Sequence, residues 1–223
     1  MQKTVGVITI GQTPRGDMTE DIRKHLPAGT RIVEKGVLDG KTVEEIRTLK
    51  PEEGHTVLIS RLRNGKSATM AKEKVLPIIQ ELIDELHGEG VSLIILACTG
   101  RFPLFKSEIP IIYPDFLLNF AVKGLLRGGP LGVILPLPEQ GGEIINKWMG
   151  AGFNALPAAC SPYIFNEQIL IDAVKQLDRL PAMAIVLDCM GYTENMKSIA
   201  QAHTFKPVLL SRSIIYKMAG ELL

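Results

Sequence analysis

Short runs of apolar residues alternate with longer segments of helical periodicity along almost the whole chain. Several runs are continuous in Val, Ile and Leu, as expected for parallel strands that helices cover on both faces. The predicted strands are residues 4–10, 30–36, 56–60, 91–97, 109–113, 130–136, 153–158, 182–188 and 207–211. The predicted helices are residues 17–25, 42–49, 71–87, 115–126, 139–149, 166–178, 194–202 and 213–222. This alternation is typical of βαβ units and predicts a doubly wound α/β fold.

Two patterns of the first half recur in the second half. The strand and Pro-containing turn of TVGVITIGQTPRGDM (4–18) are echoed by PLGVILPLPEQGGEI (130–144), and VSLIILACTGRF (91–102) is echoed by MAIVLDCMGYT (183–193). The repeat breaks near residues 125–132, where two glycines and a proline interrupt the pattern. Each half therefore has an opening strand and a later strand that ends on a cysteine, Cys98 or Cys189.

These two cysteines are the candidate catalytic residues. In open α/β sheets, ligands bind outside the carboxyl ends of the strands, where both thiols are predicted to lie. Two thiols on opposite faces of a substrate form a two-base device, in which a thiolate removes a proton from carbon and a thiol returns one. A free thiol has a pKa of about 8.5, which helix N-termini or nearby cations lower. For either cysteine alone, a small core residue is the alternative interpretation.

The segments ACTG (97–100) and DCMGY (188–192), about 90 residues apart, resemble the aspartate/glutamate racemase superfamily. VITIGQTP, LDCMGY and the C-terminal PVLLSRSIIYKMAGELL are similar to the AroM family within it. The resemblance covers essentially the whole chain. It implies two similar Rossmann-like lobes with mainly parallel sheets, related by a pseudo-twofold axis, with an active-site cleft between them. Residues 1–115 plus 212–223 would form the first lobe and 116–211 the second, with Cys98 and Cys189 as the acid/base pair.

The sequence departs from the racemase pattern after each cysteine. The racemases usually have Asn-Thr and Thr-His there, whereas this chain has Thr99-Gly100 and Met190-Gly191. The second site thus lacks a hydroxyl and an imidazole, which Tyr192 and Thr193 would replace as hydrogen-bond donors. Asp188 is expected to raise the pKa of the adjacent thiol if its charge lies nearby.

Further residues are candidates for binding a carboxylate. The turn after the first strand offers backbone N–H groups, a threonine hydroxyl and a guanidinium, and the segment 60–69 offers a serine and an arginine to an anion. Together with the residues that follow the cysteines and the proline of the echoed turn, the substrate-binding candidates are Gly11, Gln12, Thr13, Arg15, Ser60, Arg61, Thr99, Gly100, Pro136, Gly191 and Tyr192. An ordinary surface turn is the alternative for both segments, and packing is the expected role of Cys160.

No cofactor or metal site is predicted. SRLRNGKSAT (60–69) approaches a phosphate loop but has Ser60 where the first glycine is needed. No G-x-G-x-x-G motif follows the first strand, and the four histidines have no metal-ligand spacing among themselves or with the cysteines.

The charge and the amino-acid composition of the chain disfavour several classes of binding partner. The net charge is +1 and aromatic residues make up 5% of the chain, which disfavours nucleic-acid binding. The apolar runs are too short for a transmembrane helix, and three scattered cysteines favour a reducing cytoplasm. We therefore expect a cytoplasmic protein with a small carboxylate as substrate or ligand and no membrane partner. A homodimer is one candidate for the oligomeric state, which stays open.

Three functions fit these residues. The leading hypothesis is a cofactor-independent racemase- or isomerase-like enzyme acting on a small amino or dicarboxylic acid by cysteine acid/base chemistry. The first alternative is a non-catalytic carboxylate-binding or sensory protein that retains the fold. The second is a reaction like that of maleate isomerases or decarboxylases, with Cys98 alone as nucleophile or proton donor.

Overall fold

The computed structural model describes residues 3–223 and divides into two compact units. Unit 1 contains the chain up to Pro114 together with Ile215–Leu223, and unit 2 contains Asp115–Ile214. The division near the C-terminus falls inside one helix, so the end of the chain belongs to unit 1 although the strand before it belongs to unit 2.

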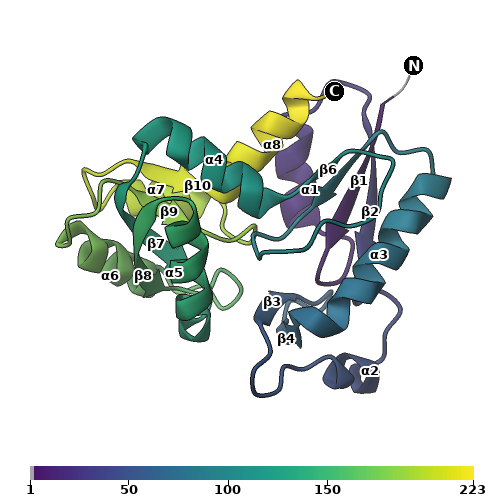
Figure 1. The fold of residues 1–223 in the computed structure, drawn as a ribbon, viewed down its shortest axis with the longest axis horizontal. Coiled ribbons are helices and arrows are strands. Elements are labelled where there is room, and N and C mark those ends of the chain that lie inside the picture. Colours follow the sequence, from purple (N-terminus) through teal and green to yellow (C-terminus); the bar gives the residue numbers. More distant parts are fainter. Residues whose placement is uncertain (1–2) are drawn as a thin grey trace. The chain divides into compact units, whose positions relative to one another are not determined.

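Unit 1 is built on a parallel sheet of four strands in the order β2-β1-β5-β6 (Figure 1). Its elements are β1 (Thr4–Thr9), α1 (Gly16–Arg23), β2 (Arg31–Gly36), α2 (Val43–Thr48), β3 (Val57–Arg61), β4 (Ser67–Ala71), α3 (Lys72–Gly88), β5 (Leu93–Leu96) and β6 (Ile111–Ile112). β3 and β4 form a separate antiparallel hairpin.

Unit 2 has a second parallel sheet of four strands, in the order β8-β7-β9-β10. Its elements are α4 (Pro114–Leu126), β7 (Gly129–Leu135), a short 3₁₀ helix η1 (Pro138–Gln140), α5 (Gly141–Gly150), β8 (Phe153–Ala159), α6 (Glu167–Asp178), β9 (Ile185–Leu187), α7 (Glu194–Gln201), β10 (Val208–Leu210) and the start of α8 (Ser211–Glu221). With β7 matched to β1 and β9 to β5, the strand order is the same in both units, which agrees with the repeat seen in the sequence.

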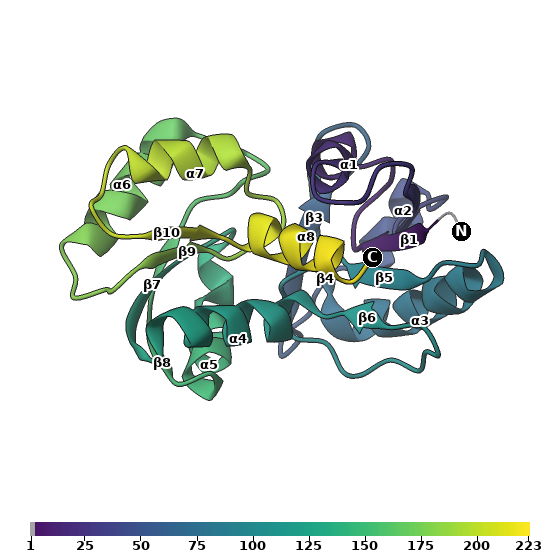
Figure 2. The ribbon, with the colours of Figure 1, turned by 90° about the horizontal axis from the view of Figure 1, so that it is seen from above.

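Helices cover both faces of each sheet (Figure 2). In unit 1, α3 packs on one face through Val75, Ile79 and Ile83, and α1 lies on the other. In unit 2, α6 and α7 share one apolar cluster with β9, while α4 and α5 share another with the opposite face of the same strand. Because β5 and β9 are inner strands covered on both faces, all of their residues are buried.

The predicted α/β class with mainly parallel sheets is confirmed, and every predicted helix and strand has a counterpart. One element was not predicted. Residues 60–69 were expected to form a loop between a strand and a helix, but the chain turns back after Arg61 and pairs Ser67–Ala71 with Val57–Arg61. Gly65, with a φ of 83°, lies in the tight turn that allows this return. Ser60 and Arg61 are therefore strand residues.

Among residues 3–223, no helix combines the length and the apolar character needed to cross a membrane.

Candidate active site

The two candidate cysteines occupy equivalent positions at the carboxyl ends of β5 and β9. The last parallel ladder bond runs from the Ala97 N–H to the Ile8 carbonyl in unit 1 (2.7 Å) and from the Asp188 N–H to the Ile134 carbonyl in unit 2 (2.9 Å). The next residue in each case is a cysteine that is half-buried and not in a disulfide. The two strands whose sequences resemble each other, β5 and β9, thus place Cys98 and Cys189 in equivalent positions.

The turn after each cysteine also repeats. The Gly100 N–H donates to the Sγ of Cys98 at 3.5 Å, and the Gly191 N–H donates to the Sγ of Cys189 at 3.3 Å. A backbone donor aimed at sulfur favours the thiolate, because hydrogen bonding to the charged form lowers a pKa. Each unit therefore holds a thiol in a Cys-x-Gly turn with a built-in donor.

The neighbours of the two turns differ. A Cβ on Gly100 would meet the Cδ2 of Leu58, from β3, at 3.0 Å. A Cβ on Gly191 would meet the ring of Tyr163 and the Cγ of Pro162, both at under 3 Å. The Tyr163 hydroxyl lies 3.4 Å from the Sγ of Cys189. Tyr163 was not among the sequence-based candidates, since it follows β8, which is not adjacent to β9 in the sheet.

The Asp188 carboxylate faces away from the Cys189 thiol. Alternation along β9 places Asp188 on the α5 face, where it accepts two 2.9 Å hydrogen bonds from the Lys147 ammonium and one of 2.8 Å from the indole of Trp148. The Lys147 and Asp188 side chains are 1% and 0% exposed. The Asp188 carboxylate is therefore paired with a buried cation, on the opposite face of the strand from the Cys189 thiol.

Residues at the start of α8 fix the backbone of the Cys189 turn. The Ser211 hydroxyl donates to the carbonyl of Cys189 at 2.9 Å. The guanidinium of Arg212, which is 1% exposed, donates to the carbonyls of Met190 at 2.8 Å and Gly191 at 3.4 Å. These bonds satisfy three successive carbonyls and hold the turn in one conformation. The segment SRSIIYK carries part of the family resemblance in the sequence, but this role was not predicted from it.

Tyr192 and Thr193 have other partners than those expected. The hydroxyl of Tyr192 donates to the Cys160 carbonyl at 2.6 Å, and the hydroxyl of Thr193 caps α7 by accepting from the Met196 N–H. Burial, reinforced by the nearby Cys189 and Cys160 groups, raises the pKa of Tyr192 well above its ordinary value, so it stays neutral. Burial also raises the pKa of Cys160 to about 11. Cys160 is thus a protonated packing residue at neutral pH, in line with the role expected for it.

The donors of the turn after β1 are engaged within unit 1. The Thr13 N–H and hydroxyl both donate to Asp39, at 2.8 and 2.6 Å. The Gln12 N–H donates to the Arg61 carbonyl and its amide to the Leu38 carbonyl, while the Gly11 N–H donates to the Thr9 hydroxyl. A ligand at this turn would have to displace these acceptors, so the expected free carboxylate donors are not available in this conformation.

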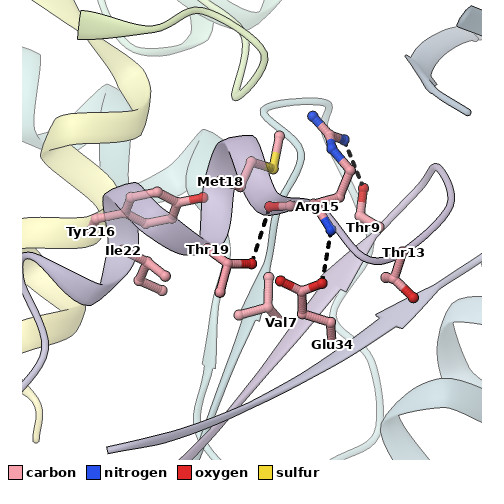
Figure 3. A pocket seen from close by; sticks show the side chains of 9 residues that line it. All are labelled: Val7, Thr9, Thr13, Arg15, Met18, Thr19, Ile22, Glu34 and Tyr216. Carbon is pink, nitrogen blue, oxygen red and sulfur yellow. Dashed lines mark hydrogen bonds between the residues drawn. The ribbon is translucent and has the colours of Figure 1, made fainter. Parts of the chain in front are cut away.

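Arg15 is buried and occupied by side chains of its own unit (Figure 3). Its guanidinium makes two 2.9 Å bonds to Asp17 and donates to the hydroxyls of Thr9 and Ser60. Its backbone N–H donates to Glu34 at 2.8 Å. Arg15, Thr9 and Glu34 line a small pocket between β1, α1 and α8, together with Val7, Met18, Ile22 and the aromatic Tyr216. Arg15 therefore fixes this region and is not poised for an anion.

Arg61 differs from Arg15. Its Nε is buried and has no hydrogen-bond partner among residues 3–223.

The remaining candidates, Thr99 and Pro136, are both buried, Thr99 next to Cys98 and Pro136 directly after β7. The structure thus gathers Gly11, Gln12, Arg15, Ser60 and Arg61 at one place in unit 1, and the Cys189, Gly191 and Tyr192 group in unit 2.

The sequence model of the AroM protein family matches residues 5–223. The chain belongs to the AroM family. The resemblance to this family that the cysteine segments and the C-terminal motif indicated is thereby confirmed. No curated protein matches the chain in sequence.

Solved structures show that this AroM family chain has the fold of the aspartate and glutamate racemases. It is similar to glutamate racemase isoform RacE1 from Bacillus anthracis, with 16% identity, 99% of this chain and 81% of that chain covered and a TM-score of 0.64. The aspartate racemase of Picrophilus torridus has 16% identity, 96% and 91% coverage and a TM-score of 0.59. The Gly74Cys mutant of arylmalonate decarboxylase has 13% identity, 98% and 92% coverage and a TM-score of 0.65.

Replacement of Gly11 by Ala should destabilise the protein. An added Cβ would collide with the Arg61 carbonyl and the Ser60 hydroxyl, and a backbone carbonyl in a strand cannot yield easily. We expect a loss of about 2 kcal/mol in the free energy of unfolding, measured by chemical denaturation. Gly16→Ala is the matched control, because an added Cβ there would meet nothing within 4 Å and alanine favours the first turn of α1. Equal stabilities of the two variants would contradict the close approach.

Replacement of Lys147 by Met should destabilise unit 2. The change leaves the Asp188 carboxylate buried without its cation, which costs about 3–5 kcal/mol. The double variant Lys147→Met/Asp188→Asn should recover part of this loss, since the uncompensated charge is gone. Lys175→Met, on the exposed face of α6, should change the free energy of unfolding by less than about 0.5 kcal/mol. A Lys147→Met variant as stable as this control would refute the buried pair.

Proposed function

We propose that the protein is a cofactor-independent racemase- or isomerase-like enzyme that acts on a small amino or dicarboxylic acid, with Cys98 and Cys189 as its acid and base. The observation that carries the proposal is the equivalence of the two Cys-x-Gly turns, each at the end of an inner parallel strand and each with a glycine N–H directed at sulfur. A single structural cysteine needs neither the second copy nor the donor.

The proposed reaction is a proton exchange at carbon. One thiolate takes the proton from the carbon beside the carboxylate, so that a C–H bond breaks and an S–H bond forms. The other thiol gives its proton to the opposite face of that carbon, which forms the new C–H bond and leaves a thiolate. The chemistry requires both sulfurs to reach the same carbon atom. The glycine donors would favour the thiolate form of either sulfur, since a hydrogen bond to the charged form stabilises it.

Arg61 is the cation that we assign to the substrate carboxylate. Its buried Nε has no acceptor among residues 3–223, whereas Arg15 is already paired with Asp17. A carboxylate would supply the missing acceptor and gain a charge-assisted hydrogen bond. Thr99, Gly100 and Gly191, beside the two sulfurs, remain the proposed contacts to the reacting end of the substrate.

Exchange of the α-proton for deuterium in D₂O tests the proposal, with aspartate, glutamate and other small amino and dicarboxylic acids as candidate substrates. Cys98→Ser and Cys189→Ser should each lower the exchange rate by at least about 100-fold, the usual contribution of a general acid or base. Cys160→Ser is the control, because its thiol is protonated at neutral pH and should not take part.

The outcome of this assay separates the alternatives. Full activity in the Cys98→Ser variant would refute the proposed acid/base pair. Loss on the Cys98 change alone would indicate a single-cysteine reaction. A ligand that raises the melting temperature of the protein without any exchange would indicate a binding or sensory protein.

Arg61→Met should raise KM for the acid that exchanges by at least about tenfold, since a hydrogen bond to a charged group contributes about 1.5–3 kcal/mol. The kcat should fall less, because Arg61 binds the carboxylate equally in the ground and transition states. Arg23→Met, an exposed cation at the end of α1, should leave KM unchanged. Equal KM values for Arg61→Met and wild type would exclude Arg61 from the carboxylate site.

A further inference from the structure

The Cys189 turn and the loop after β8 are tied together by two tyrosines. The loop begins at Cys160, whose carbonyl accepts the hydrogen bond from the buried Tyr192 hydroxyl at 2.6 Å. Three residues later, the hydroxyl of Tyr163 lies 3.4 Å from the Cys189 Sγ. Two hydrogen bonds thus join the loop to the turn, and they fix the position of the Tyr163 hydroxyl.

Contacts on two sides fix the position of Tyr163. The hydroxyl of Ser161 accepts hydrogen bonds from the Tyr163 and Ile164 N–H groups, at 3.2 and 3.4 Å, which fixes the backbone of the loop. On the other side, the Tyr163 ring lies where a side chain at residue 191 would be, with the Cζ atom 2.9 Å from an added Cβ. Glycine at 191 is therefore needed for the ring to cover the turn.

The corresponding place in unit 1 has different chemistry. There the neighbour of the glycine is Leu58, whose apolar Cδ2 lies 3.0 Å from an added Cβ on Gly100. The two turns share their backbone geometry but not the side chain that covers them.

We propose that Tyr163 is a positioning residue for Cys189, whose hydroxyl donates a hydrogen bond to the sulfur and stabilises its thiolate. The proposal rests on the proposed function for its use in catalysis, with Cys189 as the base that Tyr163 prepares. A tyrosine hydroxyl keeps its proton to a pKa of about 10, so it remains a donor when the thiol ionises.

Several charged and titratable groups of the Cys189 turn and its neighbouring segments in unit 2 have hydrogen-bond or ionic partners of their own. Asp188 is paired with Lys147 on the opposite face of β9, and Arg212 donates to the carbonyls of the turn. Tyr192 is held neutral by burial, and the high pKa of Cys160 keeps it protonated. Glu194, at the start of α7, accepts a hydrogen bond from Ser213. The Tyr163 hydroxyl, in contrast, lies within hydrogen-bond distance of the sulfur, at 3.4 Å.

The test is the pH profile of alkylation of Cys189 by iodoacetamide in the full-length protein, resolved from Cys98 and Cys160 by mass spectrometry of peptides. In Tyr163→Phe, the midpoint of the Cys189 profile should rise by about one pH unit, which is a tenfold loss of thiolate below the midpoint. The ring is kept, so packing is preserved, and the Cys98 profile should not move. A Cys189 profile that superimposes on that of wild type would overturn the proposal.

A second variant disrupts the contact between Tyr163 and Cys189 by a change in the turn instead of in the tyrosine. Gly191→Ala should push the Tyr163 ring off the turn and raise the Cys189 midpoint in the same direction. Tyr113→Phe is the matched control, since it removes a hydroxyl that accepts from the Phe105 N–H in unit 1. An equal shift of the Cys189 profile in Tyr113→Phe would show a general effect of hydroxyl loss and overturn the assignment. Because alkylation needs no turnover, the result decides the role of Tyr163 even if the exchange assay refutes the proposed function.

Discussion

The last ladder bond of each inner strand is the interaction on which the candidate site depends. The bonds from Ala97 to Ile8 and from Asp188 to Ile134 end the parallel pairing of β5 with β1 and of β9 with β7. Beyond them the backbone leaves the sheet, and the next side chain is the first one that is not fully buried. In unit 1 the strand is apolar up to this point, as is usual for a buried parallel strand, whereas in unit 2 the residue before the thiol is the buried Asp188, paired with Lys147. In both units the cysteine stands where the strand leaves the buried sheet.

Alternation along the strand then separates the charge from the thiol. Asp188 and Cys189 are neighbours in sequence, but successive side chains of a strand point to opposite faces. The carboxylate is neutralised by Lys147 and Trp148 of α5, whereas the sulfur lies on the face of α6 and α7. The negative charge is thus adjacent to the thiol in the chain but is paired with its cation on the other face of the sheet.

Much of the fold follows from the sequence because its signals are local. Continuous apolar runs and the 3.6-residue period of α3 identify the elements, and the echo between the halves anticipates the shared strand order. The β3–β4 hairpin was missed because Ser67–Ala71 is short and only half apolar, so its pairing with β3 is what makes it a strand. The partners of the turn after β1 were missed for a related reason. Asp39 and Glu34 are 26 and 19 residues away from Thr13 and Arg15 in the sequence and meet them only in the folded chain. No spacing in the sequence indicates that these donors already have acceptors.

The repeat of the two units explains their shared backbone features but not the side chains that lie beside each cysteine turn. A repeated βαβ frame reproduces the strand order, the last ladder bond and the glycine donor at each sulfur, because these depend on backbone geometry. The side chain over each turn comes from a connection that the two units do not share: the β3–β4 hairpin brings Leu58 to Gly100, and the loop after β8 brings Tyr163 to Gly191. An apolar cover disfavours a thiolate by desolvation, whereas a hydroxyl stabilises it. The frame therefore holds the two thiols alike, whereas the side chain beside each turn differs between the units.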